Sequence, residues 1–231
     1  MYSHPNPFLN NAWEQSSLLI FRGQVYPKGS KYFLWGGKMR KSRAQSAATR
    51  ERILSTATKM FLDKGLGTVG MRDIMAGASL MPGGFYRHFQ SKDQLIAIAS
   101  GTAFDRAYAM LEGETMGKSP AEAVERIVSV YLGQTQAEGK PYLCPLAMLG
   151  AELSHSDPQV RAIAVDGYQR IVQLIANYLT DQTRRGALIT ASGIVSTLVG
   201  AVTLAEITPD SAMARAILRN AKVLIKKYIL R

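Results

Sequence analysis

The chain has 231 residues, of which 47% are hydrophobic and 19% are charged. These proportions exclude disorder of the whole chain, and the length suits one large domain or a small domain joined to a medium one. The formal net charge is +11. Residues 39–95 hold ten Lys or Arg against four acidic residues, whereas residues 96–231 hold fourteen against twelve. This asymmetry predicts a module that binds a polyanion joined to a module with another task, with a solvated basic face as the alternative.

Cysteine content and apolar runs indicate the compartment. The single cysteine, Cys144, allows no disulfide within the chain and fits a reducing cytoplasm. The start MYSHPNPF lacks a cationic region, and the apolar run at 18–21 is too short for a signal peptide. Residues 186–205 carry no charge and are long enough for a bilayer, but they include three glycines and five Ser or Thr residues. We therefore expect a cytoplasmic protein with a buried interface helix there and no membrane partner.

Residues 1–38 differ from the rest of the chain. They are rich in proline, glycine and aromatic residues and show neither helical nor strand periodicity. Met39 is followed at once by a polar, basic arm that leads into an amphipathic helix. We expect residues 1–38 to be disordered or a mis-assigned N-terminal extension, with Met39 as the biological start. An ordered arm that adds DNA or partner contacts is the alternative.

From Ala48 onward the pattern predicts one helix after another. An apolar stripe marks the first helix, and Gly65 ends it as a C-cap; the stripe comprises Ile53, Leu54, Ala57, Met60 and Phe61. Capping signals mark later starts at Ser91–Gln94, Ser119–Glu122, Asp157-Pro158 and Thr208-Pro209. We place the later helices near 120–138, 143–154, 158–183, 190–206 and 209–229. Since no segment shows sustained strand alternation bounded by hairpin turns, the predicted fold is all-α.

Residues 71–95 carry the functional motif. A short helix is predicted at Met71–Ala78, followed by a tight turn at Ser79–Met81 and a second short helix that Pro82 opens. Phe85 and Phe89, four residues apart, are expected to anchor the second helix to the core. Two short helices around a turn of three or four residues make a helix-turn-helix, whose second helix fits the major groove of DNA.

The outward residues of this second helix suit a DNA backbone and base edges. We predict that the DNA-binding residues are Pro82, Gly83, Gly84, Tyr86, Arg87, His88 and Lys92. The glycines allow close approach to phosphate, and the Tyr86 and His88 side chains can donate to phosphate oxygens. Arg87 suits a guanine edge or a phosphate, and Lys92 would neutralise a flanking phosphate.

Residues 50–95 resemble the DNA-binding domain of the TetR family. The matching positions are Phe61, Gly65, Ile74, Gly83, Tyr86, Phe89, Ser91, Lys92 and Leu95. Three positions depart from the family pattern: Ser79 replaces the turn glycine, Met81 the polar cap, and Pro82 the basic residue that follows it.

The resemblance implies a domain organisation and a function. Residues 39–95 would form an N-terminal three-helix DNA-binding domain with a helix-turn-helix, and residues 96–231 a C-terminal helical domain for ligand binding and dimerisation. The implied function is an effector-released repressor that binds a palindromic operator in double-stranded DNA as a homodimer. A DNA-independent helical binding module is a less favoured alternative, and an enzyme on an all-helical scaffold is a second one that would need a catalytic constellation the sequence lacks.

The resemblance also implies dimerisation through the last two helices. Gly193, Thr197, Gly200 and Leu204 fall on one face and form a seam of small residues that permits close approach of a partner helix. Ile217, Leu224 and Tyr228 add a broader apolar face on the final helix, suited to a four-helix contact. Packing within one chain is the alternative explanation of both faces.

The effector is an unidentified small molecule, and Cys144, Met148 and Tyr108 are the candidate pocket or sensor residues. Cys144 lies at a predicted helix start, where a thiol pKa is lowered, so a redox or electrophile sensor of the same fold is an alternative function. A small buried hydrophobe is the plainer interpretation of that cysteine. No catalytic set, cofactor motif or metal-ligand cluster is present in the sequence, so we expect no enzyme, no cofactor and no metal.

Overall fold

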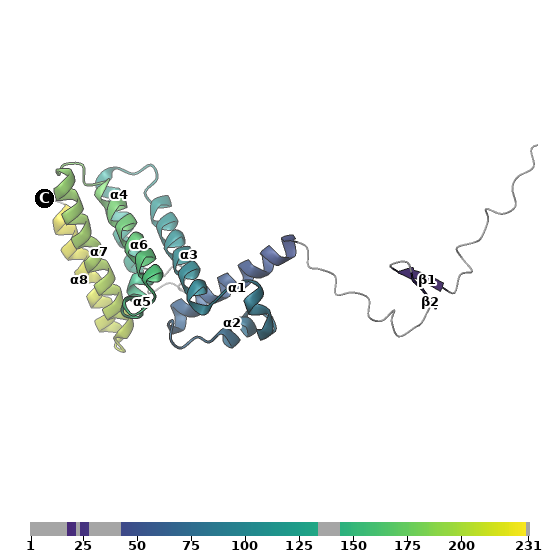
Figure 1. Ribbon diagram of the computed structural model, residues 1–231. Helices are drawn as coiled ribbons and strands as arrows, with labels where there is room; N and C mark the ends of the chain where they lie inside the picture. Colours follow the sequence, from purple (N-terminus) through teal and green to yellow (C-terminus); the bar gives the residue numbers. More distant parts are fainter. Residues whose placement is uncertain (1–17, 22–23, 28–42, 134–143, 230–231) are drawn as a thin grey trace, which may run out of the picture. The chain divides into compact units, whose positions relative to one another are not determined.

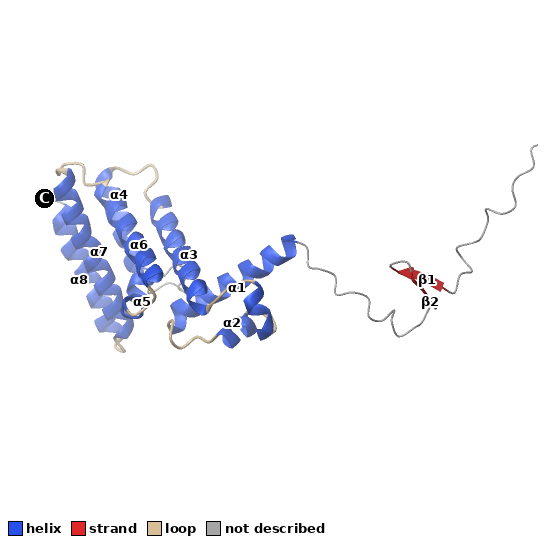
Figure 2. Ribbon diagram, viewed as in Figure 1, coloured by secondary structure: helices blue, strands red, loops and turns tan. Residues whose placement is uncertain are grey.

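The structure is a computed structural model that describes residues 18–21, 24–27, 43–133 and 144–229. The chain divides into two compact units, Met1–Ser46 and Ala47–Arg231. In the first unit, strands β1 (Leu18–Phe21) and β2 (Gln24–Pro27) pair antiparallel (Figures 1 and 2). Neither segment shows sustained strand alternation in the sequence, but two short segments separated by two residues can form a hairpin. The proposed start at Met39 lies outside the described residues.

The second unit begins with the predicted helix-turn-helix region, which we call the head. It contains α1 (Arg43–Lys64, which starts in the first unit), α2 (Met71–Gly77) and the 3₁₀ helix η1 (Pro82–Arg87). The α1 helix ends where the sequence predicts. Gly65 has a φ of +86°, a left-handed conformation that glycine adopts without strain, and its N–H donates to the Phe61 carbonyl at 2.8 Å.

The remaining helices form the body, which Figure 2 shows, in its described residues, as helices joined by short loops. They are α3 (Lys92–Gly113), α4 (Pro120–Gly133), α5 (Pro145–Ser154), α6 (Pro158–Ala176), α7 (Arg184–Ile207) and α8 (Ser211–Ile229). The all-α prediction is thus confirmed for both head and body. The predicted boundary between α6 and α7 is wrong, because α7 starts six residues earlier than expected. The Thr183 hydroxyl accepts a hydrogen bond from the Gly186 N–H at 3.2 Å, a polar N-cap ahead of the apolar pattern.

Three of the four predicted helix starts are confirmed by their caps. The Ser91 hydroxyl accepts from the Gln94 N–H at 3.0 Å at the start of α3. The Ser119 N–H donates to the Glu122 carboxylate at 3.0 Å before α4, and the Asp157 carboxylate accepts a backbone N–H at 2.8 Å before α6. These local hydrogen bonds satisfy N–H groups that the first helical turn leaves without partners.

The cap predicted at Thr208-Pro209 is wrong. The Asp210 carboxylate instead accepts from the Ala212 N–H at 2.7 Å and caps α8. The Thr208 hydroxyl donates back to the Leu204 carbonyl at 2.5 Å, at the end of α7. Threonine and aspartate are both common N-cap residues, and Asp210 directly precedes α8, whereas Thr208 lies two residues further away.

Buried side chains form two clusters. The body cluster comes from α3 to α8 and includes Val124, Ile127, Ile171, Ile194, Leu198, Leu218 and Ile225. The head cluster includes Ile53, Phe61, Ile74, Phe85 and Phe89, and also Leu149, Leu153 and Val160 from α5 and α6. Because α5 and α6 contribute to both clusters, the body helices form part of the support of the head.

The apolar helix noted in the sequence is α7. By length and composition alone it could cross a membrane, and it is the one such helix in the described part of the chain. In the structure α7 contacts α4, α5, α6 and α8, and its inner residues Ile194, Val195 and Leu198 are fully buried in the body cluster. This packing is that of a core helix in a helical domain and agrees with the sequence interpretation.

Candidate nucleic-acid interface

Two phenylalanines fix η1 to the head. Phe85 and Phe89 are 1% and 2% exposed, and their ring centroids lie 5.7 Å apart. The Arg50 guanidinium of α1 lies 4.8 Å from the Phe89 ring centroid, within the range of a cation–π contact. The predicted inward orientation of both rings is therefore confirmed.

The turn between α2 and η1 uses a serine in a conformation that favours glycine. Ser79 has a φ of +55°, and the Leu80 N–H after it donates to the Met75 carbonyl at 2.8 Å. A left-handed conformation costs an ordinary residue about 1–2 kcal/mol. Ser79 thus replaces the turn glycine of the family pattern but keeps the left-handed backbone conformation of that turn.

The second helix of the motif is a 3₁₀ helix of six residues, a geometry that no pattern in the sequence predicts. Pro82, Gly83, Tyr86 and Arg87 are exposed, as predicted. Gly84 and His88 are half-buried, so the structure covers part of these two predicted contacts. The Tyr86 ring stands edge-on to Phe85, with centroids 5.3 Å apart, and is 67% exposed.

Lys92 lies at the start of α3, as predicted, but its ammonium has a partner within the chain. The Lys92 Nζ donates to the Leu66 carbonyl at 2.8 Å. The Gly67 N–H, one residue further on, donates to the Glu152 carboxylate of α5 at 2.8 Å. The loop between α1 and α2 is therefore held by a cation from one side and an anion from the other. Contact of Lys92 with phosphate stays a prediction.

Sequence reasoning missed several residues of this surface. Exposed cations of the head lie on α1 and α2 as well as on η1, and those of α1 and α2 are Arg43, Arg52, Lys59, Lys64 and Arg72. Met81, treated above only as a departure from the family pattern, is 81% exposed directly before η1. Glu152 gave no signal, because its partner Gly67 lies 85 residues away in the sequence.

Two of the three candidate effector residues, Cys144 and Met148, lie one turn apart at the start of α5, and the third, Tyr108, lies on α3. Tyr108 and Cys144 pack with the body cluster, whereas Met148 packs against the head cluster. The Tyr108 hydroxyl donates to Glu112 at 3.1 Å, and the Arg170 guanidinium lies 4.6 Å from the Tyr108 ring centroid. Partial burial, together with Glu112, raises the pKa of Tyr108. These contacts describe a packed aromatic residue.

Cys144 occupies the N-cap of α5 and is 3% exposed. Burial raises the pKa of the Cys144 thiol, although the Tyr131 hydroxyl and the N–H groups of Leu146 and Ala147 act in the opposite direction. The expectation that the helix N-terminus lowers this pKa is therefore wrong, since desolvation outweighs the helix end.

Tyr131 lies beside Cys144 in the body cluster and is 2% exposed. Among the described residues, its hydroxyl is the one buried side-chain oxygen or nitrogen without a hydrogen-bond partner of ordinary geometry. The neighbouring thiol is only a weak partner. The hydroxyl therefore keeps its hydrogen-bonding capacity inside an apolar core.

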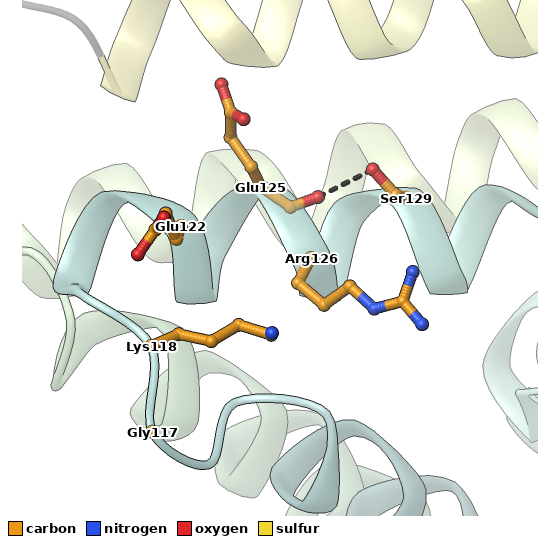
Figure 3. Close-up of a pocket in the computed structure, with 6 residues that line it drawn as sticks. All are labelled: Gly117, Lys118, Glu122, Glu125, Arg126 and Ser129. Carbon is orange, nitrogen blue, oxygen red and sulfur yellow. Dashed lines mark hydrogen bonds between the residues drawn. The ribbon is translucent and has the colours of Figure 1, made fainter.

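A surface hollow of about 370 Å³ lies at the start of α4 (Figure 3). Two of its charged groups are paired within the chain: Arg126 with Glu114 at 2.7 Å, and Glu125 with Lys226 at 3.0 Å. Hydrogen bonds from the Ser119 hydroxyl and N–H lower the pKa of Glu122. Among the described residues, no group of three or more His, Cys, Asp or Glu side chains is placed to hold a metal ion.

The predicted dimer seam lies on the outer surface of α7. Gly193 and Gly200 have no atom within 4 Å of where a Cβ would stand. The Thr197 hydroxyl donates to the Gly193 carbonyl at 2.9 Å, and Leu204 is 51% exposed. Ile189 and Ile207 extend the same stripe at helical spacing and are 65% and 70% exposed.

The final helix α8 continues this apolar surface. Leu224 is 46% exposed, and Ile217 is half-buried against the body cluster. Met213, 58% exposed, lies on the same stripe at helical spacing. The side chain of Tyr228 lies outside the described residues.

An exposed helix-turn-helix with a basic surface, joined to a helical body, defines a DNA-binding transcriptional regulator. Residues 53–98 match the model of bacterial regulatory proteins of the tetR family. Residues 120–220 match the model of the C-terminal domain of LmrA/YxaF-like transcriptional regulators. The chain belongs to the TetR family of transcriptional regulators.

Named relatives agree with this assignment. The chain is 29% identical over 147 residues to the HTH-type transcriptional regulator UidR of Escherichia coli K12. This match spans 63% of this chain and 72% of UidR. It is 40% identical over 53 residues to the HTH-type transcriptional repressor KstR2 of Mycolicibacterium smegmatis, a match spanning 23% of this chain and 26% of KstR2. A TetR transcriptional regulator from Chloroflexus aurantiacus has a similar crystal structure, with a TM-score of 0.71, 26% identity, and coverage of 81% of this chain and 97% of that one.

Proposed function

We propose that this regulator is a cytoplasmic, effector-released repressor that binds a palindromic operator as a homodimer. The observation that carries the proposal is the presence, in one compact unit, of an exposed helix-turn-helix and an outward-facing seam of small residues on α7. A single head makes few phosphate contacts. Two heads about 34–36 Å apart would reach successive major grooves on one side of the duplex.

The proposed effector response requires a link between body and head, and α5 provides one. Its N-cap Cys144 belongs to the body cluster beside the Tyr131 hydroxyl, which among the described residues has only this weakly bonding thiol for a hydrogen-bonding neighbour, and its Glu152 accepts from Gly67 in the head. We infer that a small, largely apolar molecule bound against Tyr131 would shift α5. The contact between Glu152 and Gly67 would pass this shift of α5 to the head, so that the two recognition helices would no longer match the operator.

The first experiment measures binding of the full chain to the DNA upstream of its own gene, by gel shift and fluorescence anisotropy. We expect tighter binding than to unrelated DNA of equal length, and an affinity that falls linearly on a logarithmic salt scale. Affinity that ignores both sequence and salt would instead favour a DNA-independent binding module.

Arg87→Ala is expected to weaken operator binding by about 1–3 kcal/mol per half-site if the guanidinium contacts a guanine edge, and to relax the base preference there. Arg87 is exposed on η1, so its removal leaves the core intact. The matched control is Arg161→Ala, which removes an exposed arginine from α6 of the body. Equal operator affinity for the Arg87 variant and the control would remove Arg87 from the interface.

The redox-sensor alternative predicts a reactive Cys144. Because burial raises the pKa of this thiol, its thiolate fraction at pH 7 is below that of a free cysteine. We expect iodoacetamide to label the native chain at least about tenfold more slowly than the chain in denaturant at the same pH. Faster labelling of the native chain would favour the sensor function.

The raised pKa of the Cys144 thiol also means that the body loses stability as the pH rises above the ordinary thiol value of about 8.5.

A further inference from the structure

Met81 is the most exposed large apolar side chain among the described residues, at 81%. A single exposed apolar residue on a protein surface needs no explanation. The position of Met81 does call for an explanation, because Met81 is the N-cap residue of η1. In helix-turn-helix proteins the N-terminal residues of this helix are the ones that contact base edges.

The surface around Met81 offers few hydrogen-bond donors. Pro82 and Gly83 follow it, are exposed and carry no polar side-chain atom, and a Cβ at Gly83 would meet nothing within 4 Å. Met81 precedes the first turn of η1 with an extended backbone, and Arg87 is the last residue of this 3₁₀ helix, which has three residues per turn. The first part of the helix to meet a groove is thus apolar, and the cation lies two turns further on.

The major groove presents one apolar feature to such a side chain, which is the C5-methyl group of thymine. Adenine, guanine and cytosine edges present donors and acceptors there, and a thioether against them would leave these groups without partners. Resting on the proposed DNA-binding function, we propose that Met81 selects a thymine in each operator half-site by packing on its methyl group.

The test begins with selection of bound sequences from a pool of duplexes with a randomised core, using the full-length dimer. The wild type should enrich a motif with a thymine that Met81→Ala no longer selects and Met81→Leu, which keeps an apolar side chain, still selects. Met116→Ala is the matched control, since Met116 lies in the loop after α3 and is 78% exposed. It should return the wild-type motif. Circular dichroism melts of all variants should coincide, because both methionines are exposed.

The second step replaces the selected thymine by deoxyuridine, which removes the methyl group and leaves base pairing unchanged. Loss of one buried methyl group lowers wild-type affinity by about fourfold per half-site, or about fifteenfold when both half-sites are changed. The Met81→Ala variant should bind both duplexes equally.

The outcomes separate the two proposals. If the wild type enriches no sequence at all, the proposed operator binding fails, and the role of Met81 fails with it. If the wild type enriches a motif that Met81→Ala also enriches unchanged, or if deoxyuridine leaves the wild-type affinity unaltered, DNA binding stands and the selection by Met81 is overturned.

Discussion

Gly200→Leu is expected to turn the proposed dimer into a monomer and to lower operator affinity, although no proposed DNA-binding residue changes. A Cβ at this position meets nothing within 4 Å in its own chain, so we expect the fold of the monomer to tolerate a larger side chain. In the proposed dimer the same side chain would enter a close helix contact from both protomers. Overpacking costs about 1–3 kcal/mol per site, so two sites raise the dimer dissociation constant by about 30-fold to about 10⁴-fold.

Sedimentation equilibrium and operator binding would be measured together, with circular dichroism as the check on folding. Gly150→Leu is the control, because Gly150 is a helical glycine of α5 with equally open surroundings. It should stay dimeric. A Gly200→Leu protein that remains a dimer with normal operator affinity would place the interface elsewhere, and one that unfolds would show that the seam belongs to the internal core.

Local patterns in the sequence predicted those features that depend on neighbouring residues. The Phe85–Phe89 pair, the C-cap at Gly65 and the N-cap at Ser91 each involve residues at most four positions apart. For the same reason the helix-turn-helix and its exposed Arg87 could be predicted without a structure.

Features that depend on tertiary structure could not be predicted in this way. The direction of the Cys144 pKa shift follows from burial among residues of several helices, and only the helix end is visible in the sequence. The Glu152–Gly67 contact joins residues far apart in the chain. Strands β1 and β2 were missed for a different reason, because β1 is a continuous apolar run of four residues, and periodicity cannot assign such a run to a strand.

The support of η1 leads to the second large expected effect. A six-residue 3₁₀ helix has no stability of its own, so its position depends on the Phe85 ring buried among the head cluster. Phe85→Ala should destabilise the head by about 3–5 kcal/mol and lower operator affinity more than about 100-fold. The body cluster does not include Phe85, so α7 and α8 should stay folded and the protein should stay dimeric.

Hydrogen exchange measured by mass spectrometry distinguishes this local effect from global unfolding. In Phe85→Ala, peptides from residues 71–95 should lose protection, while peptides from α7 and α8 keep the wild-type level. Phe85→Leu is the control, because it keeps most of the buried apolar volume and should recover most of the operator affinity. Equal loss of protection in head and body would mean that the two clusters unfold as one cooperative unit. Wild-type operator affinity in Phe85→Ala would mean that η1 does not need this anchor to bind DNA.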